Sequence, residues 1–156
     1  MNELELRPLM PEDAGAARAV IVARLGGTRY EARTLEQLDV ALTFEDPEYM
    51  ALLAVEPESE QLLGLVMFGA VAGAKQVTKL HALIGDDAGT CAALAEAVRT
   101  VASEAGERMV VAELPDDRSF RDSIAALRHS AFDEEGRVDD FVTDGVGLRF
   151  LVWRRT

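Results

Sequence analysis

Few side chains in this 156-residue sequence are suited to catalysis. Glu113 closes the apolar run from Met109 to Leu114, and partial burial there would make its carboxylate a stronger general base. His81 is a second candidate, because an imidazole titrates near neutrality. The sequence places no catalytic partner beside Cys91, which we therefore expect to be a small buried apolar residue. The chemistry that these types predict is proton transfer, with Glu113 or His81 as the base.

Structural interpretations of the same residues stay open. Glu113 could instead bond to loop amides or to Arg118, and a lone histidine on a strand, such as His81, is more often structural. His129 is expected to be an exposed position on the last helix. One cysteine and two distant histidines show no zinc-site spacing, so no metal is expected.

Composition narrows the class of protein. The chain has 28 acidic and 16 basic residues, a formal net charge of −12, which argues against a nucleic-acid or anionic-membrane partner. The same charge weakly favours cationic substrates. A single cysteine and an acidic N-terminus without signal-peptide features predict a cytoplasmic protein.

Hydrophobic periodicity and turn residues predict the element order β-α-α-β-β-β-α-β-α-β-β. From it we expect one domain over residues 1–156, of α/β class, with a mixed central sheet of about seven strands and helices on both faces in three layers. Thr34 to Gln37 has the form of a capping box and predicts a helix start at Thr34. The expected strands are Leu4–Leu6, Met50–Val55, Leu62–Val71, Gln76–Ile84, Met109–Leu114, Val138–Val142 and Gly147–Trp153.

Three segments carry a resemblance to a known family. The stretch from Leu127 to Phe141 resembles the "Tyr-x-x-x-Gly-Phe-x-x-Glu-Gly-Arg" segment of the GNAT-type N-acetyltransferases. Asp144 to Trp153 resembles the closing hairpin of that family, and Arg7 to Asp13 resembles its "Arg-x-x-x-x-x-Asp" start. With the element order, the resemblance covers nearly the whole chain. It implies transfer of an acetyl group from acetyl-CoA to a primary amine by direct attack.

The resemblance also implies where the site lies. In the family, acetyl-CoA binds in a splay between the fourth and fifth strands, here Gln76–Ile84 and Met109–Leu114, and a bulge near Leu80–Ile84 supplies backbone donors. Ala112-Glu113-Leu114 resembles the family's "Leu-Glu-Val" and makes Glu113 the first choice of base, with His81 second. The residues expected to hold acetyl-CoA are Leu83, Ile84, Gly85, Gly89, Thr90 and Cys91.

Two departures from the family pattern weaken this expectation. The "Gln/Arg-x-x-Gly-x-Gly/Ala" signature becomes Asp86, Gly89 and Cys91, and Asp87 is expected to cap the following helix at Thr90 and so to compete with a phosphate. Leu127 stands at the position of the family's tyrosine, so the general acid is missing. Tyr30 and Tyr49 are the two tyrosines of the sequence and could in principle supply that acid, but no pattern in the sequence places them at the site.

Three further points remain as alternatives. The only lysines, Lys75 and Lys79, lie near the expected cofactor strand, either as an anion site or as a solvated strand end. The acidic stretch from Asp133 to Asp144 is either a rim that attracts a small cationic amine or protein amine, or a solvated hairpin face. The chain itself is either an active enzyme, with a homodimer as one expectation, or a catalytically degenerate GNAT-fold module that binds a ligand or partner.

Overall fold

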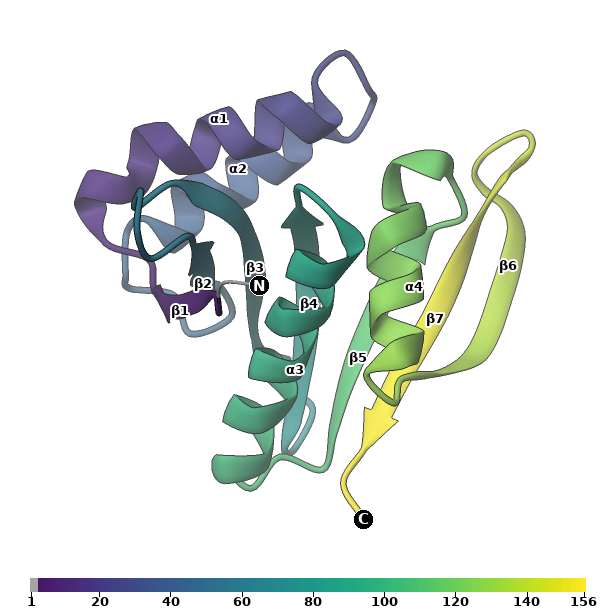
Figure 1. Cartoon of the computed structure of the whole chain (residues 1–156). Helices are drawn as coiled ribbons and strands as arrows, with labels where there is room; N and C mark the ends of the chain where they lie inside the picture. The colour runs from purple at the N-terminus through teal and green to yellow at the C-terminus, as the bar shows by residue number, and fades with distance from the viewer. Residues whose placement is uncertain (1–2) are drawn as a thin grey trace.

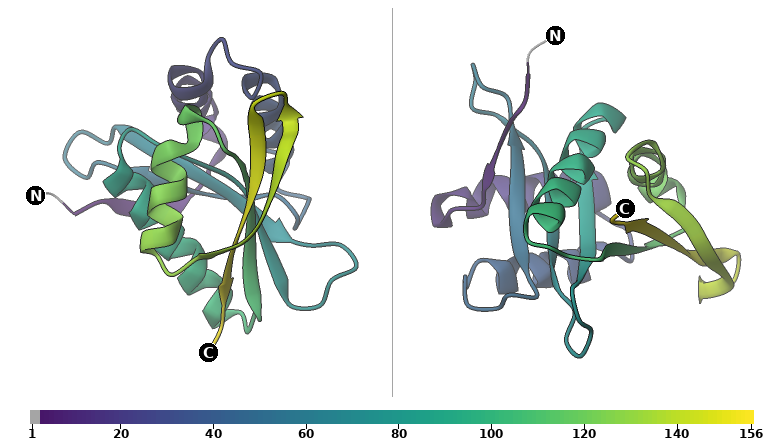
Figure 2. Two further views of the ribbon diagram at one scale, coloured as in Figure 1. Left: turned by 90° about the vertical axis from the view of Figure 1, so that its right-hand side faces the viewer. Right: turned by 90° about the horizontal axis from the view of Figure 1, so that it is seen from below.

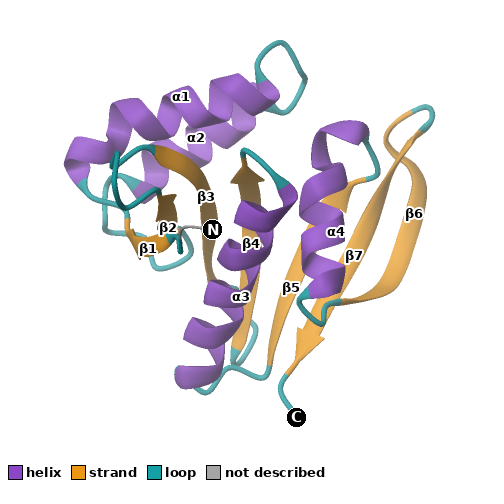
Figure 3. Ribbon diagram, in the orientation of Figure 1, coloured by secondary structure: helices purple, strands orange, loops and turns teal. Residues whose placement is uncertain are grey.

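The computed structural model describes residues 3–156 and arranges them around one mixed sheet (Figures 1 and 3). The seven strands are β1 (Glu5–Pro8), β2 (Met50–Val55), β3 (Leu62–Ala70), β4 (Val77–Gly85), β5 (Met109–Pro115), β6 (Asp133–Thr143) and β7 (Val146–Arg154). The helices are α1 (Ala14–Leu25), α2 (Glu31–Ala41), α3 (Ala88–Glu104) and α4 (Arg121–His129), with short 3-10 turns at Pro11–Asp13 and Arg118–Phe120. The predicted element order is confirmed.

The strand order across the sheet is β1-β2-β3-β4-β5-β7-β6. Neighbouring strands are antiparallel except β4 and β5, which run parallel and are joined through α3. A parallel pair needs such a crossover, because its strands must begin at the same edge of the sheet.

Helices cover both faces of the sheet, which confirms the three-layer α/β class (Figure 2). A Cβ atom at Gly64 of β3 would lie 2.9 Å from Cγ2 of Thr90 in α3, whereas one at Gly69 would meet the backbone of Glu48, in the loop that joins α2 to β2. Both α1 and α2 also contact β3. Residues an odd number apart on a strand face opposite sides. Therefore α3 lies over one face, and α1 and α2 lie over the other.

The buried faces of the helices follow the predicted apolar spacing. In α3, Leu94, Val98 and Ala102 recur at helical intervals and are at most 2% exposed. Leu127 in α4 is fully buried, so its expected place in the core is confirmed. His129 is exposed, as expected. None of the helices within residues 3–156 is long and apolar enough to cross a membrane.

Two element starts differ from the sequence prediction by three residues or more, and the other strand bounds differ by at most two. Thr34 does not begin α2; it lies inside the helix, and its hydroxyl donates to the carbonyl of Tyr30. The helix starts earlier because the amide of Glu31 already bonds to the carbonyl of Thr28. The first strand of the C-terminal hairpin is also longer than Val138–Val142 and begins at Asp133.

The parallel pair opens toward its C-terminal end. Paired residues run from Val77 with Met109 to Leu80 with Ala112, and no pairing of β4 with β5 follows within the described residues. Figure 1 shows the two strands side by side at one end and apart at the other, with α4 in front of the opening. This splay is the feature that positions the candidate site.

Candidate functional site

His81 lies on a β-bulge at the point where the splay begins. On β4, Ala82 pairs with Met67 and Leu80 pairs with Phe68, which leaves His81 as the extra residue. A bulge bends its strand and redirects the side chain it carries. The expectation of a bulge within Leu80–Ile84 is confirmed.

The surroundings of His81 fix its protonation. Its Nε2 lies 2.7 Å from the carbonyl oxygen of Glu48, and its ring stacks on Tyr49 with centroids 4.4 Å apart. Since a carbonyl only accepts, Nε2 carries the proton and Nδ1 keeps its lone pair. Burial lowers the pKa of His81 below its usual value, and the cations of Lys79 and Arg33 lower it further, against the opposing Glu48 hydrogen bond. At neutral pH the imidazole is therefore a neutral base.

His81 borders a cavity of about 260 Å³ on the α1–α2 face, hereafter the splay cavity. Its apolar wall includes Leu25 of α1, Ile84 of β4, Phe120, and Phe141 and Leu148 from the C-terminal hairpin. Its polar and charged lining is Arg29, Tyr30, Arg33, Thr34, Gln37, His81 and Glu113. The cavity therefore brings together both sequence-predicted base candidates.

Glu113 lies in the splay cavity, and its side chain is 40% exposed, more open than the partial burial expected of it. Its carboxylate is 3.6 Å from Nζ of Lys79, and no bond joins it to Arg118 among residues 3–156. The alternative partner considered for Glu113 is thus wrong. Of the two candidate bases, His81 is the more enclosed and has its tautomer fixed.

The two tyrosines, Tyr30 and Tyr49, lie near the cavity and differ in their surroundings, which decide whether either could supply the missing general acid. Tyr30 donates its hydroxyl to Oδ2 of Asp117 at 3.0 Å and packs edge-on against Phe120. Burial, reinforced by Asp117, raises the pKa of Tyr30 to about 12. Its proton is therefore held tightly in the bond to Asp117. Tyr49 serves as the stacking partner of His81.

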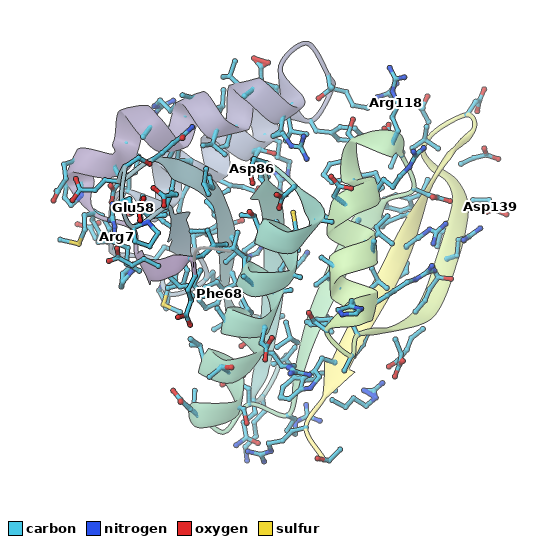
Figure 4. All side chains as sticks on the ribbon, in the orientation of Figure 1. Arg7, Glu58, Phe68, Asp86, Arg118 and Asp139 are labelled. Atoms are coloured by element: carbon cyan, nitrogen blue, oxygen red, sulfur yellow. The ribbon has the colours of Figure 1, made fainter. Side chains whose placement is uncertain are left out.

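The junction between β4 and α3 is closed by its own carboxylates. Asp87 caps α3 and accepts from the amide of Thr90 at 2.8 Å, as the sequence predicted. Asp86 accepts from the hydroxyl of Thr90, also at 2.8 Å. Figure 4 shows Asp86 at this junction. Two donors at the start of the helix are thus already satisfied by negative groups.

The residues expected to hold acetyl-CoA cluster at this junction but differ in access. Leu83, Ile84, Thr90 and Cys91 are each at most 5% exposed. Gly85 is also buried, and a Cβ there would lie 2.9 Å from Sγ of Cys91, so close packing requires the glycine. Gly89 alone of the predicted set is exposed.

Cys91 is a packing residue in this arrangement. Its side chain is 1% exposed, and burial raises the pKa of its thiol to about 11. A thiol at neutral pH stays protonated under these conditions and is a poor nucleophile. This agrees with the sequence interpretation of Cys91 as a small apolar residue.

Acetyl-CoA fits this site at one end only. The amide of Asp86 bonds to Leu63 on β3, so the alternation of an antiparallel ladder turns the backbone groups of Leu83 and Gly85 toward the splay. The hydroxyl of Ser123 in α4 satisfies the carbonyl of Leu83 at 2.6 Å. The splay thus suits the thioester end, whereas the capped start of α3 does not suit a pyrophosphate.

The other charged features lie away from the cavity. None of the acidic residues from Asp133 to Asp144 lines it, and Figure 4 shows Asp139 at the outer edge of the hairpin. Within that stretch Glu134 pairs with Arg149 at 3.2 Å, and Glu135 pairs with Arg154. Lys75 precedes β4, and it therefore lies at the end of that strand that is remote from the start of α3.

Arg29 and Arg33 are cavity residues that sequence reasoning missed. Arg29 lies in the turn before α2, and Arg33 lies in its first turn. No sequence signal marked them, because both have the pattern of ordinary surface charges beside Glu31.

Comparison with solved structures identifies the fold. A putative GNAT-family acetyltransferase from Desulfovibrio desulfuricans superposes with a TM-score of 0.80 at 19% identity, over 97% of this chain and 99% of the other. An N-acetyltransferase from Staphylococcus aureus Mu50 gives 0.75 at 15% identity, over 98% and 99%. The ribosomal-protein-alanine N-acetyltransferase of Brucella melitensis gives 0.74 at 16% identity, over 97% and 100%.

No sequence-family model and no curated protein matches the chain in sequence. The likeness therefore rests on three-dimensional structure, and it extends over nearly the full length of this chain and of each compared structure. The chain has the fold of the GNAT N-acetyltransferases.

Proposed function

We propose that this protein is an N-acyltransferase that moves an acetyl group from acetyl-CoA to a primary amine by direct attack. The observation that carries the proposal is the coincidence of three features: a splay between β4 and β5, a bulge at its apex, and a cavity lined by a neutral imidazole. The GNAT fold agrees with this reading, since its solved neighbours bear acetyltransferase names.

Acetyl-CoA supplies an activated thioester. The reaction forms a carbon–nitrogen bond to the acceptor and breaks the carbon–sulfur bond. The nitrogen gives one proton to solvent after the attack, and before the attack the ammonium form of the acceptor must lose one proton. Nδ1 of His81 receives that proton, because Nε2 is held by Glu48 and Nδ1 is free to accept. Backbone amides beside the bulge polarise the carbonyl oxygen under attack. The leaving sulfur takes its proton from solvent, since Leu127 is buried core and Tyr30 is bonded to Asp117.

His81 now precedes Glu113 as the base. Glu113 faces the same cavity, but its partner is Lys79, and its place suits contact with the ammonium form of the acceptor. A cation held there would lie beside the imidazole that deprotonates it. The roles of both residues follow from this arrangement.

The test is acetyl transfer to a panel of amines, followed by release of the CoA thiol. His81→Gln keeps a donor for the carbonyl of Glu48 but loses the base, so kcat/KM is expected to fall about 100-fold or more. Glu113→Gln is the matched comparison and should lower it less. Equal or unchanged rates in the two variants would remove His81 as the base, and no transfer to any amine would contradict the proposed function.

The second candidate is a ligand-binding module that has lost transfer. The capped start of α3 favours it, because Asp86 and Asp87 occupy donors that a pyrophosphate needs. It predicts that ligands bind in the splay cavity without turnover. Transfer at a rate that depends on His81 would exclude it.

A further inference from the structure

The splay cavity carries a charge opposite to that of the protein. Acidic residues outnumber basic ones 28 to 16 in the sequence, yet the cavity is lined by two arginines and a single carboxylate. That carboxylate, Glu113, is already paired with Lys79. The cavity therefore presents uncompensated positive charge.

Arg29 and Arg33 are both exposed side chains that line the cavity, and no protein partner holds either of them in the described part of the chain. Among residues 3–156 neither guanidinium forms an ion pair or a side-chain hydrogen bond, although Arg7, Arg18 and Arg24 all pair with aspartates. Free guanidinium groups facing a cavity are ready to bind an anion.

The electrostatics of their neighbours agree with this placement. The positive charge of Arg33 contributes to the lowered pKa of His81, and that of Arg29 opposes the raised pKa of Tyr30. Both arginines therefore act on side chains of the same cavity. A group bound by them would lie within the site that holds the candidate base.

Resting on the proposed function, we propose that the acceptor is a small amine that also carries a carboxylate. Arg29 and Arg33 bind the carboxylate, because guanidinium groups match it in charge and planar geometry. The amine of the same molecule then lies toward His81 and Glu113. A cavity of about 260 Å³ suits a molecule of amino-acid size. This assignment differs from the sequence expectation, which was a small cationic amine or a protein amine as the acceptor.

The first experiment compares free amino acids with their carboxamides as acetyl acceptors. Each amide keeps the amine and loses the negative charge, so wild-type kcat/KM should favour the acid by about tenfold or more. In the double variant Arg29→Gln, Arg33→Gln that preference should disappear, while the Kd for acetyl-CoA stays the same. Arg155→Gln removes an exposed arginine outside the cavity and should keep the preference.

The second experiment needs no turnover and separates this inference from the proposed function. N-acetyl amino acids and their amides are titrated calorimetrically into the wild type and the double variant. Binding of the acids alone, lost in the double variant, supports the carboxylate site even if transfer is absent. Equal binding of acids and amides, no binding of either, or a preference that survives the double variant overturns it, even if neutral amines are acetylated well.

Discussion

Two places in this molecule offer hydrogen-bond donors to an anion, and they differ in what already occupies them. At the start of α3, the amide and hydroxyl of Thr90 bond to Asp87 and Asp86. At the start of α2, Arg29 and Arg33 face the splay cavity without an ion-pair partner among residues 3–156. The site that the family resemblance marks for phosphate carries two carboxylates that bond to Thr90, whereas the unmarked site carries two guanidinium groups that are unpaired within the described chain.

The comparison shows that an anion site depends on unsatisfied donors more than on their position in a fold. A helix start carries partial positive charge in any protein, but a capping carboxylate consumes it locally. Guanidinium groups keep their charge at every physiological pH and stay available until something pairs with them. The following predictions test each side of this contrast.

The largest expected effect is on the pH dependence of transfer. Because burial lowers the pKa of His81 below 6.5, kcat/KM should be level across neutral pH and fall about tenfold per pH unit below that pKa. The unfolded chain binds the proton more tightly, so the free energy of unfolding also falls as pH drops below 6.5. Circular dichroism at each pH separates the two effects. An acid limb of the kcat/KM profile with its midpoint above pH 6.5 would contradict His81 as the base.

The second prediction concerns the two carboxylates at the start of α3. Asp86→Asn with Asp87→Asn removes two negative charges and keeps an acceptor oxygen for the helix cap, so the Kd for acetyl-CoA should fall about tenfold. Asp139→Asn, on the outer edge of the hairpin, is the control and should leave the Kd unchanged. If the Kd of the double variant equalled that of the wild type, neither carboxylate would act on bound acetyl-CoA.

The third prediction separates capping from charge at the same turn. Asp87→Ala should lower the free energy of unfolding by about 1 kcal/mol, since the amide of Thr90 loses its acceptor. Asp86→Ala should cost less, because its bond is to a side-chain hydroxyl, which can rotate to another acceptor, whereas a backbone amide cannot. Urea denaturation measures both. Equal losses would mean that Asp87 is not the dominant cap.

The smallest effect concerns coupling within the cavity. Arg33→Gln removes a cation that lowers the pKa of His81, so the acid limb of the pH profile should move to higher pH. The shift should be modest, because burial is the larger cause. Arg155→Gln should leave the limb in place. A limb that moves down, or does not move, would separate Arg33 from the imidazole.

Local signals predicted the fold well. Apolar spacing placed α3 with Leu94 and Val98 inward, and the Asp87 cap could be recognised from its position before Thr90. Thr34 failed for a related reason. Its capping-box pattern is local, but the carbonyl of Thr28 already starts the helix upstream, and two competing starts cannot be ranked without the tertiary packing.

The candidate site could be predicted only in part. His81 and Glu113 were identified because a polar residue in an apolar strand stands out. Arg29 and Arg33 read as ordinary surface charges near Glu31, and only the packing of α1 over β3 and β4, and of α2 over β3, brings them to the cavity. The acidic hairpin was conspicuous in the sequence, yet it contributes only apolar side chains to the cavity.

The most direct test of the proposed acyl transfer is a calorimetric titration of acetyl-CoA into the wild-type protein, with a thermal-unfolding scan of the same samples. We predict saturable binding, and a free energy of unfolding about 2.7 kcal/mol higher when the ligand is at 100 times its Kd. The weakened pyrophosphate end should make that Kd tighten on Asp86→Asn with Asp87→Asn. No heat and no stabilisation at millimolar acetyl-CoA, in wild type and double variant alike, would contradict the use of acetyl-CoA by this protein.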